Sequence, residues 1–183
     1  MKVNKSTDYK ITFYLIISII LLILSTAICS AQDNISIGLY QDIRLATVGD
    51  DKGNDAFTTD VKLDISLQGY QLNQYYFSVN TQFEYATLKG GDYFSLMVVP
   101  NWTLNDLIVE KVEVGAGVII GLIHRWGAGY ATYGLSGDVS YMIAPKLKIS
   151  LLGQLIKRGD LADRWNTKGL SPNVYLGIKY NLK

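Results

Sequence analysis

The chain has very few of the residues that build thiol or metal centres. Its 183 residues include one cysteine, Cys29, and one histidine, His124. A single thiol cannot form an internal disulfide. One histidine beside one thiol leaves only carboxylates as metal ligands. The sequence therefore predicts no disulfide framework, no metal site and no cofactor.

The chain also lacks a large charge of either sign. It carries 17 basic and 16 acidic residues, for a formal net charge of +1. A basic patch is the electrostatic footprint of nucleic-acid binding, so we expect no nucleic-acid partner. Long apolar runs are scarce too, since only residues 11–28 could span a bilayer as a helix.

That apolar run belongs to an N-terminal segment with the layout of an export signal. The segment begins with the basic residues Lys2, Lys5 and Lys10. Residues 11–28 follow, and then the small residues 29–31. We predict a cleavable signal peptide over 1–31 and one domain over 32–183, with a retained membrane anchor as the alternative. Cleavage would remove the only cysteine, three lysines and one aspartate, and so change the net charge from +1 to −1.

What the chain has in abundance is an apolar–polar alternation between Ile35 and Leu182. In residues 57–68 one face collects Phe57, Val61, Leu63, Ile65 and Leu67. A period of two places alternate side chains on opposite faces of a β-strand. The pattern predicts an all-β domain of eight strands at 35–45, 57–69, 77–86, 93–102, 112–122, 132–143, 147–155 and 173–182.

The connections between these strands alternate in kind. Four are polar and rich in glycine, at 47–55, 88–92, 124–129 and 158–169, whereas those at 71–74 and 144–146 are short. Long loops on one side and short turns on the other are typical of an up-and-down transmembrane β-barrel. A soluble ligand-binding barrel shows the same strand alternation with its apolar face inside, and is the alternative.

Two features favour an apolar exterior. Aromatic residues of the apolar face gather near the strand ends, at Phe57, Phe77, Tyr85, Phe94, Trp102, Tyr133, Tyr141 and Tyr180. Such girdles match the two interfaces of a membrane, where amphipathic rings prefer to lie. The polar face is rich in small residues, which suit the narrow interior of an eight-stranded barrel.

The chain after residue 31 resembles the OmpA/OmpX-type superfamily of eight-stranded outer-membrane β-barrels. The resemblance lies in its length, strand parity, loop pattern and final amphipathic strand over 174–182. It implies an antiparallel barrel integral to the cell outer membrane of a Gram-negative envelope, with both termini in the periplasm. Its implied partners are outer-membrane lipid and the outer-membrane assembly machinery.

Charged residues on the predicted inner face must be compensated. By strand parity they are Asp42, Arg44, Asp60, Lys62, Asp64, Glu84, Glu113, Asp138, Lys148 and Lys179. An isolated buried charge is costly, so a nearly balanced set predicts networks of ion pairs and hydrogen bonds that fill the lumen. The alternative for the same residues is an ion path or a proton relay.

The outer loops are the predicted place of function. The longest, 158–169, offers Arg158, Asp160, Arg164 and Trp165 as contact candidates, because Trp and Arg are favoured in contact patches. Its Arg-Gly-Asp start is an adhesion tripeptide in other contexts. We expect a non-enzymatic protein with a structural or surface-interaction role, in adhesion or envelope integrity, toward a surface ligand of unknown identity. The alternatives are a lipid A-modifying enzyme that uses His124 for acid–base chemistry, and a narrow pore.

Overall fold

The computed structural model describes residues 35–105, 110–166 and 169–182. The predicted signal peptide at 1–31 lies outside these residues. The described elements are β1 (Ile35–Asp42), α2 (Ile43–Thr47), β2 (Asp60–Leu72), β3 (Tyr75–Ala86), β4 (Tyr93–Asn105), β5 (Val112–Arg125), β6 (Ala128–Ala144), β7 (Leu147–Lys157), α3 (Gly159–Trp165) and β8 (Leu170–Asn181). Within the described ranges, no helix is long and apolar enough to cross a membrane.

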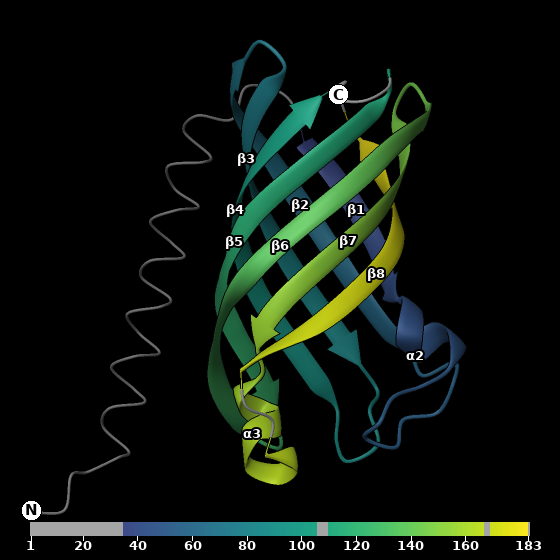
Figure 1. The fold of residues 1–183 in the computed structure, drawn as a ribbon, viewed down its shortest axis with the longest axis vertical. Coiled ribbons are helices and arrows are strands. Elements are labelled where there is room, and N and C mark those ends of the chain that lie inside the picture. Colours follow the sequence, from purple (N-terminus) through teal and green to yellow (C-terminus); the bar gives the residue numbers. More distant parts are fainter. Residues whose placement is uncertain (1–34, 106–109, 167–168, 183) are drawn as a thin grey trace, which may run out of the picture.

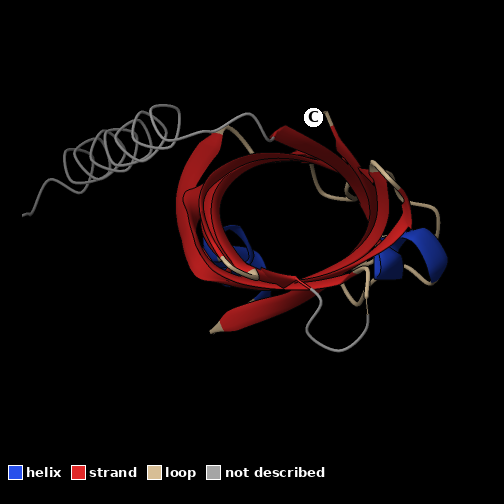
Figure 2. Cartoon of the chain, turned by 90° about the horizontal axis from the view of Figure 1, so that it is seen from above, coloured by secondary structure: helices blue, strands red, loops and turns tan. Residues whose placement is uncertain are grey.

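The strands form one closed antiparallel barrel in the order of the sequence. Each strand pairs with the next, and β8 pairs with β1 in a register that sets Ser36 opposite Asn181. Figure 2 shows the resulting ring along its axis. The start of β1 and the end of β8 lie at the end with the short turns, opposite α2 and α3 (Figure 1). The predicted eight-stranded up-and-down barrel is confirmed.

The alternation along each strand places apolar side chains outside. Outward aliphatic residues of β1, β6, β7 and β8 are about half exposed, at Leu39 50%, Leu135 54%, Val139 47%, Leu151 45%, Leu176 51% and Ile178 51%. Inward positions instead hold buried charged residues, such as Lys62 and Asp64 on β2. A protein in water keeps its charges on the surface and its aliphatic residues inside. The polarity of this barrel is inverted with respect to that pattern.

Outward aromatic residues lie near both ends of the strands. Tyr85 and Phe94 pair across the loop end of the β3–β4 hairpin, whereas Phe77 and Trp102 pair near its turn end with ring centroids 5.3 Å apart. The other predicted girdle residues in strands are also outward and exposed, at Tyr133 60%, Tyr141 49% and Tyr180 46%. Phe57 differs from the prediction, because it lies in the connection before β2 with a φ of 64° and is 87% exposed.

The first strand ends earlier than its alternation predicts. Asp42 closes β1 as the N-cap of α2, and its carboxylate accepts the backbone N–H of Leu45 at 2.9 Å. This capping bond stabilises a helical turn over a continued strand. It buries Leu45 and leaves the side chain of Arg44 49% exposed, in α2 beyond the end of β1. Arg44 thus lies in a helical turn and not, as predicted, on the inner face of a strand.

The predicted loop at 124–129 is also wrong. β5 continues to Arg125 and β6 begins at Ala128, so that only Trp126 and Gly127 form the turn. Both have positive φ, at 53° and 72°. Positive φ at both central residues is the geometry of a two-residue hairpin turn matched to strand twist. The longest predicted loop, 158–169, instead contains the helix α3.

Part of the interior is apolar. Inward residues of β3, β4, β5 and β7 form one buried cluster of Ala86, Tyr93, Met97, Val99, Ile119, Ile123 and Ile156. Strand parity places these residues inside, but their apolar character does not follow from the alternation. The barrel thus combines an ordinary packed core in part of the lumen with a charged network in the rest.

Inward and outward glycines differ in the space around them. A Cβ on inward Gly134 would overlap the carbonyl oxygen of Leu155 and lie 2.9 Å from the Cα of Ile156. A Cβ on outward Gly153 would meet nothing closer than the carbonyl oxygen of Gly137, at 3.7 Å. The inward glycine is thus required by the close approach of two strands, and the outward one is not.

We predict that Gly134→Ala destabilises the barrel and that Gly153→Ala does not. Overpacking of this kind costs about 1–3 kcal/mol of unfolding free energy. The urea midpoint of the refolded barrel in lipid vesicles measures the effect, with Gly153→Ala as the matched control. Equal midpoints for the two variants would contradict the steric argument.

Candidate functional site: the charged lumen and its loop-end closure

The centre of the lumen is organised around the ion pair of Lys62 and Glu84. Lys62 Nζ lies 3.2 Å from a carboxylate oxygen of Glu84, and both side chains are almost fully buried. Glu84 also accepts hydrogen bonds from the hydroxyls of Tyr175 at 2.9 Å and Ser95 at 3.2 Å. These bonds to an ionised acceptor are of the stronger kind, which offsets the loss of water around the charges.

Lys62 has two further partners from distant strands. Its ammonium donates to the amide oxygen of Gln154 on β7 and lies 3.8 Å from the centre of the Tyr175 ring on β8. Gln154 in turn donates to Gln82 on β3 at 2.8 Å. A cation over an aromatic face is attracted by the ring quadrupole. Lys62 is therefore held by the protein in place of water.

Two more ion pairs lie toward the turn end. Lys179 of β8 contacts Asp138 of β6 at 3.0 Å, and Asp138 also accepts from Ser140 at 3.4 Å. Lys148 of β7 contacts Glu113 of β5 at 2.6 Å. Each pair joins two strands that are not adjacent in the barrel, so the pairs stabilise the ring from inside.

The structure thus places the predicted lumen residues inside the barrel, Arg44 excepted. Seven of them are buried, at Asp42 4%, Asp60 3%, Lys62 0%, Asp64 2%, Glu84 3%, Asp138 7% and Lys148 7%. In the described part of the chain, one carboxylate oxygen each of Asp60 and Asp64 has no hydrogen-bond partner. The network also has uncharged members that the prediction of charged residues leaves out, although strand parity directs them inward as well: Gln82, Gln154 and Tyr175.

Two separate cavities lie in the described lumen. One of about 220 Å³ opens at the turn end and one of about 200 Å³ at the loop end, and they share no lining residue. On β2 the turn-end cavity reaches Ser66 and the loop-end cavity reaches Asp60, with Lys62 and Asp64 between them. On β3 the intervening inward residue is Gln82. The charged layer therefore lies between these two cavities.

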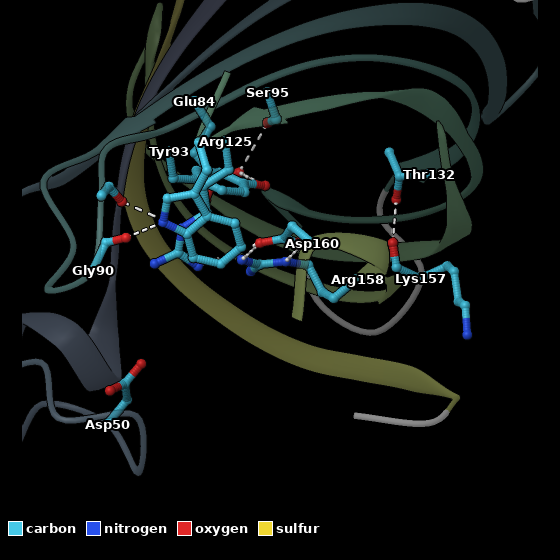
Figure 3. A network of polar contacts seen from close by, with 12 residues as sticks. Asp50, Glu84, Gly90, Tyr93, Ser95, Arg125, Thr132, Lys157, Arg158 and Asp160 are labelled. Atoms are coloured by element: carbon cyan, nitrogen blue, oxygen red, sulfur yellow. Dashed lines mark hydrogen bonds and ion pairs between the residues drawn. The ribbon is translucent and has the colours of Figure 1, made fainter. Parts of the chain in front are cut away.

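The helix α3 covers part of the loop end with a second set of charges. Asp160 is fully buried, and its carboxylate faces the guanidinium of Arg158 (Figure 3) with two contacts of 2.8 Å. Arg125, at the end of β5, approaches the same carboxylate at 3.3 Å. Bidentate contact between a guanidinium and a carboxylate adds directional strength. Leu161 is also buried, so α3 is bound by both ion pairs and apolar contact.

Two indole rings lie beside Arg125. Arg125 lies 4.4 Å from the ring of Trp126 and 5.6 Å from that of Trp165. The two indoles stack with centroids 5.8 Å apart, and Trp126 Nε1 donates to the carbonyl of Gly90. The stack thereby connects α3, the β5–β6 turn and the β3–β4 connection.

The Arg-Gly-Asp start of the predicted contact segment 158–165 is largely buried. Asp160 is 0% exposed and the Arg158 side chain 11%, so neither forms an open recognition surface. Trp165 is half-buried in the indole stack. The side chain of Arg164 lies outside the described part of the structure. The missed partner Arg125 could have been found by continuing the parity of β5 for two residues beyond Ile123.

The environment of Asp160 favours its charged form. Burial by itself would raise the pKa of this carboxyl, but the hydrogen bonds and charges of Arg158 and Arg125 outweigh burial and lower the pKa below its ordinary value of 3.8. A group whose pKa is lower when folded stabilises the folded state above its unfolded pKa. That contribution is lost as the pH falls through the lowered value.

His124 lies on the outward face of β5 and is exposed. Its cross-strand neighbours are Phe94 and Gly129. Phe94 has no polar group and Gly129 has no side chain, so neither can orient an imidazole for proton transfer in the way a carboxylate does. The geometry therefore gives the enzymatic alternative no support.

We predict that Lys62→Met destabilises the barrel by about 3–5 kcal/mol, because it leaves Glu84 buried without its cation. The double variant Lys62→Met/Glu84→Gln should recover part of that loss. Urea unfolding of the refolded protein measures both. The control is Lys89→Met, which breaks an exposed pair with Asp55 and should cost less than about 1 kcal/mol. The assignment fails if both lysine variants lose the same stability.

We predict an acid-induced release of α3. In a Trp102→Phe background, the emission of Trp126 and Trp165 should stay constant above about pH 4 and change below it, as Asp160 takes up a proton and the ion pairs weaken. The Asp160→Asn variant should lack this transition. A transition at the same pH in both proteins would assign it to another group.

Comparisons with known proteins place the barrel beside three solved structures. No family model and no curated protein matches the chain. Neisserial surface protein A (NspA) shares 13% identity over 80% of this chain and 95% of its own, with a TM-score of 0.48. The Yersinia pestis outer membrane protein Ail shares 17% over 81% and 97%, with a TM-score of 0.44. The outer membrane protein OprG from Pseudomonas aeruginosa shares 10% over 83% and 97%, with a TM-score of 0.42. Because these identities and TM-scores are low, the conclusions below rest on the geometry of this barrel alone.

Proposed function

We propose that the protein is a non-enzymatic barrel integral to an outer membrane, with a structural or surface-interaction role. The inverted polarity of the barrel carries this proposal. Its outer wall exposes aliphatic residues on strand after strand, and its inner wall buries paired charges. Lipid tolerates only structures whose backbone polar groups are satisfied internally, and a closed barrel meets that requirement. Water would leave the exposed wall as one continuous apolar patch.

The interior argues for a structural wall rather than a conduit. The charged layer at Lys62, Glu84 and Gln82 lies between the two cavities, and Asp160 with its arginines covers part of the loop end. Eight-stranded barrels have interiors just wide enough for side chains. Lumen side chains that are paired with each other do not offer their charges to a passing ion. The pore alternative is therefore less well supported.

The surface-interaction role has a different candidate segment from the one that the sequence suggests. The connection between β1 and β2 exposes two apolar side chains, Val48 at 76% and Phe57 at 87%. It lies at the same end as α3, away from both termini of the described barrel (Figure 1). Exposed apolar groups rimmed by charges are typical of contact sites. We propose that this connection, facing outside the cell, contacts the surface partner.

Single-cysteine labelling on intact cells tests both location and orientation. In a Cys29→Ser background, we expect Phe57→Cys to react with a membrane-impermeant maleimide. Gln74→Cys, in the exposed β2–β3 turn at the other end, should react only after the outer membrane is permeabilised. Both variants should migrate faster unheated than boiled, which reports a folded barrel.

Three results would contradict the proposal. Equal labelling of the two cysteines before permeabilisation would show that no membrane separates the two ends of the barrel. The reverse order of labelling would invert the orientation. Recovery of the folded protein in the soluble fraction would favour a soluble ligand-binding barrel.

A further inference from the structure

The loop-end cavity contains more acidic groups than its cations neutralise. Its volume of about 200 Å³ is several times the ~30 Å³ that one water occupies. The acidic lining residues are Asp42, Asp50, Asp51, Asp60 and Glu84, and the basic ones are Arg44, Lys52, Arg125 and Arg158. Which of these charges remain uncompensated depends on the pairs that they form.

Every basic residue of the lining already has an acidic partner. Arg44 and Lys52 both contact Asp51, at 3.9 Å and 2.7 Å. Arg125 and Arg158 both contact Asp160 of α3. Lys62, below the cavity, pairs with Glu84. These pairings leave two buried carboxylates of the lining, Asp42 and Asp60, with no cation within 4 Å in the described part of the chain.

Asp42 and Asp60 belong to adjacent strands. The last pair in the β1–β2 register is Gln41 with Val61, so one further step sets Asp42 opposite Asp60. They are 4% and 3% exposed. Like charges directly opposite each other across two strands are destabilising. Two buried carboxyl groups in this position are accommodated when one of them carries a proton or when a positive group lies between or above them.

Asp60 is the less satisfied of the two. Asp42 accepts the N–H of Leu45 as the cap of α2, whereas Oδ1 of Asp60 has no hydrogen-bond partner in the described part of the structure. A buried carboxyl oxygen without a partner is costly, and a native example needs an explanation such as a proton or a bound ion. Asp60 lines the cavity, so a ligand entering from the loop end can reach it.

We propose that the loop-end cavity binds a small primary alkylammonium ion, with its N–H donors on Asp60 and Asp42. An ammonium group carries three donors and no acceptor, which suits carboxylate oxygens. Among the described residues no group of three His, Cys, Asp or Glu has the arrangement of a metal site. Apolar lining residues near the two carboxylates, Leu45, Ala86 and Leu88, offer a surface for a short alkyl chain.

The test uses the full-length protein extracted in detergent and titrated with n-butylammonium chloride at pH 7. Amide resonances of residues 60–62 should shift along a saturable curve. Asp60→Asn should weaken the apparent affinity about tenfold, and Asp42→Asn, which keeps a capping side chain for α2, should also weaken it. Asp51→Asn, an exposed acid already paired with Lys52, is the matched control and should change the affinity less than about twofold.

Two competing cations test the assigned chemistry. Tetramethylammonium has the same charge without N–H donors, and sodium has the charge without an alkyl chain. Both should compete at least about tenfold more weakly than n-butylammonium. A shift that does not saturate, an unchanged affinity in both Asp60→Asn and Asp42→Asn, or equal competition by sodium would each overturn the proposal.

Discussion

The constraint on which this structure depends is that charges enclosed in a narrow lumen must find their partners in the protein. Lys62 is the clearest case, because it has no exposure and receives an anion, an amide oxygen and an aromatic face from three other strands. Those partners meet only in one register. A slip of one residue in a single strand would turn its inward side chains outward. The charged network therefore specifies the pairing of the strands as well as filling the lumen.

The same constraint explains how α3 is held over the loop end. Arg125 projects inward from the end of β5, where an unpaired guanidinium would be poorly solvated. The helix α3 brings Asp160 to it, and Arg158 completes the pair from the other side. Tyr93 and the two indoles cover the remaining faces of the arginines. The closure is thus an extension of the lumen network and not a separate loop structure.

Most of the barrel could be predicted from the sequence because period two is a strong signal when one face meets lipid. Strand number, strand parity and nearly all inward charges follow from it. The errors occur where local hydrogen bonding overrides the alternation. Asp42 stops β1 by capping α2, which places Arg44 in a helix and not on a strand. Trp126 with Gly127 shortens a predicted loop to a turn.

The candidate site was harder to predict than the wall. The burial of Asp160 depends on Arg125, which is 35 positions away, so the local sequence reads as an exposed charged loop. The packing of Met97 against Ile119 could not be predicted either, since parity gives the face of a residue but not which residues lie opposite it across the lumen. Strand pairs are local features of a sequence, whereas contacts across a lumen are not.

The span of the central contacts has a consequence for the order in which the molecule assembles. Lys62 meets Gln154 across 92 positions, and Tyr175 meets Glu84 across 91. Neighbouring hairpins can form early because their loops are short, but contacts of this separation require nearly the whole chain to be arranged first. The β1–β8 seam brings the ends of the chain together and must close for the network to be complete. The buried contacts thus form late and stabilise the closed barrel. An open or misregistered intermediate is not stabilised by them.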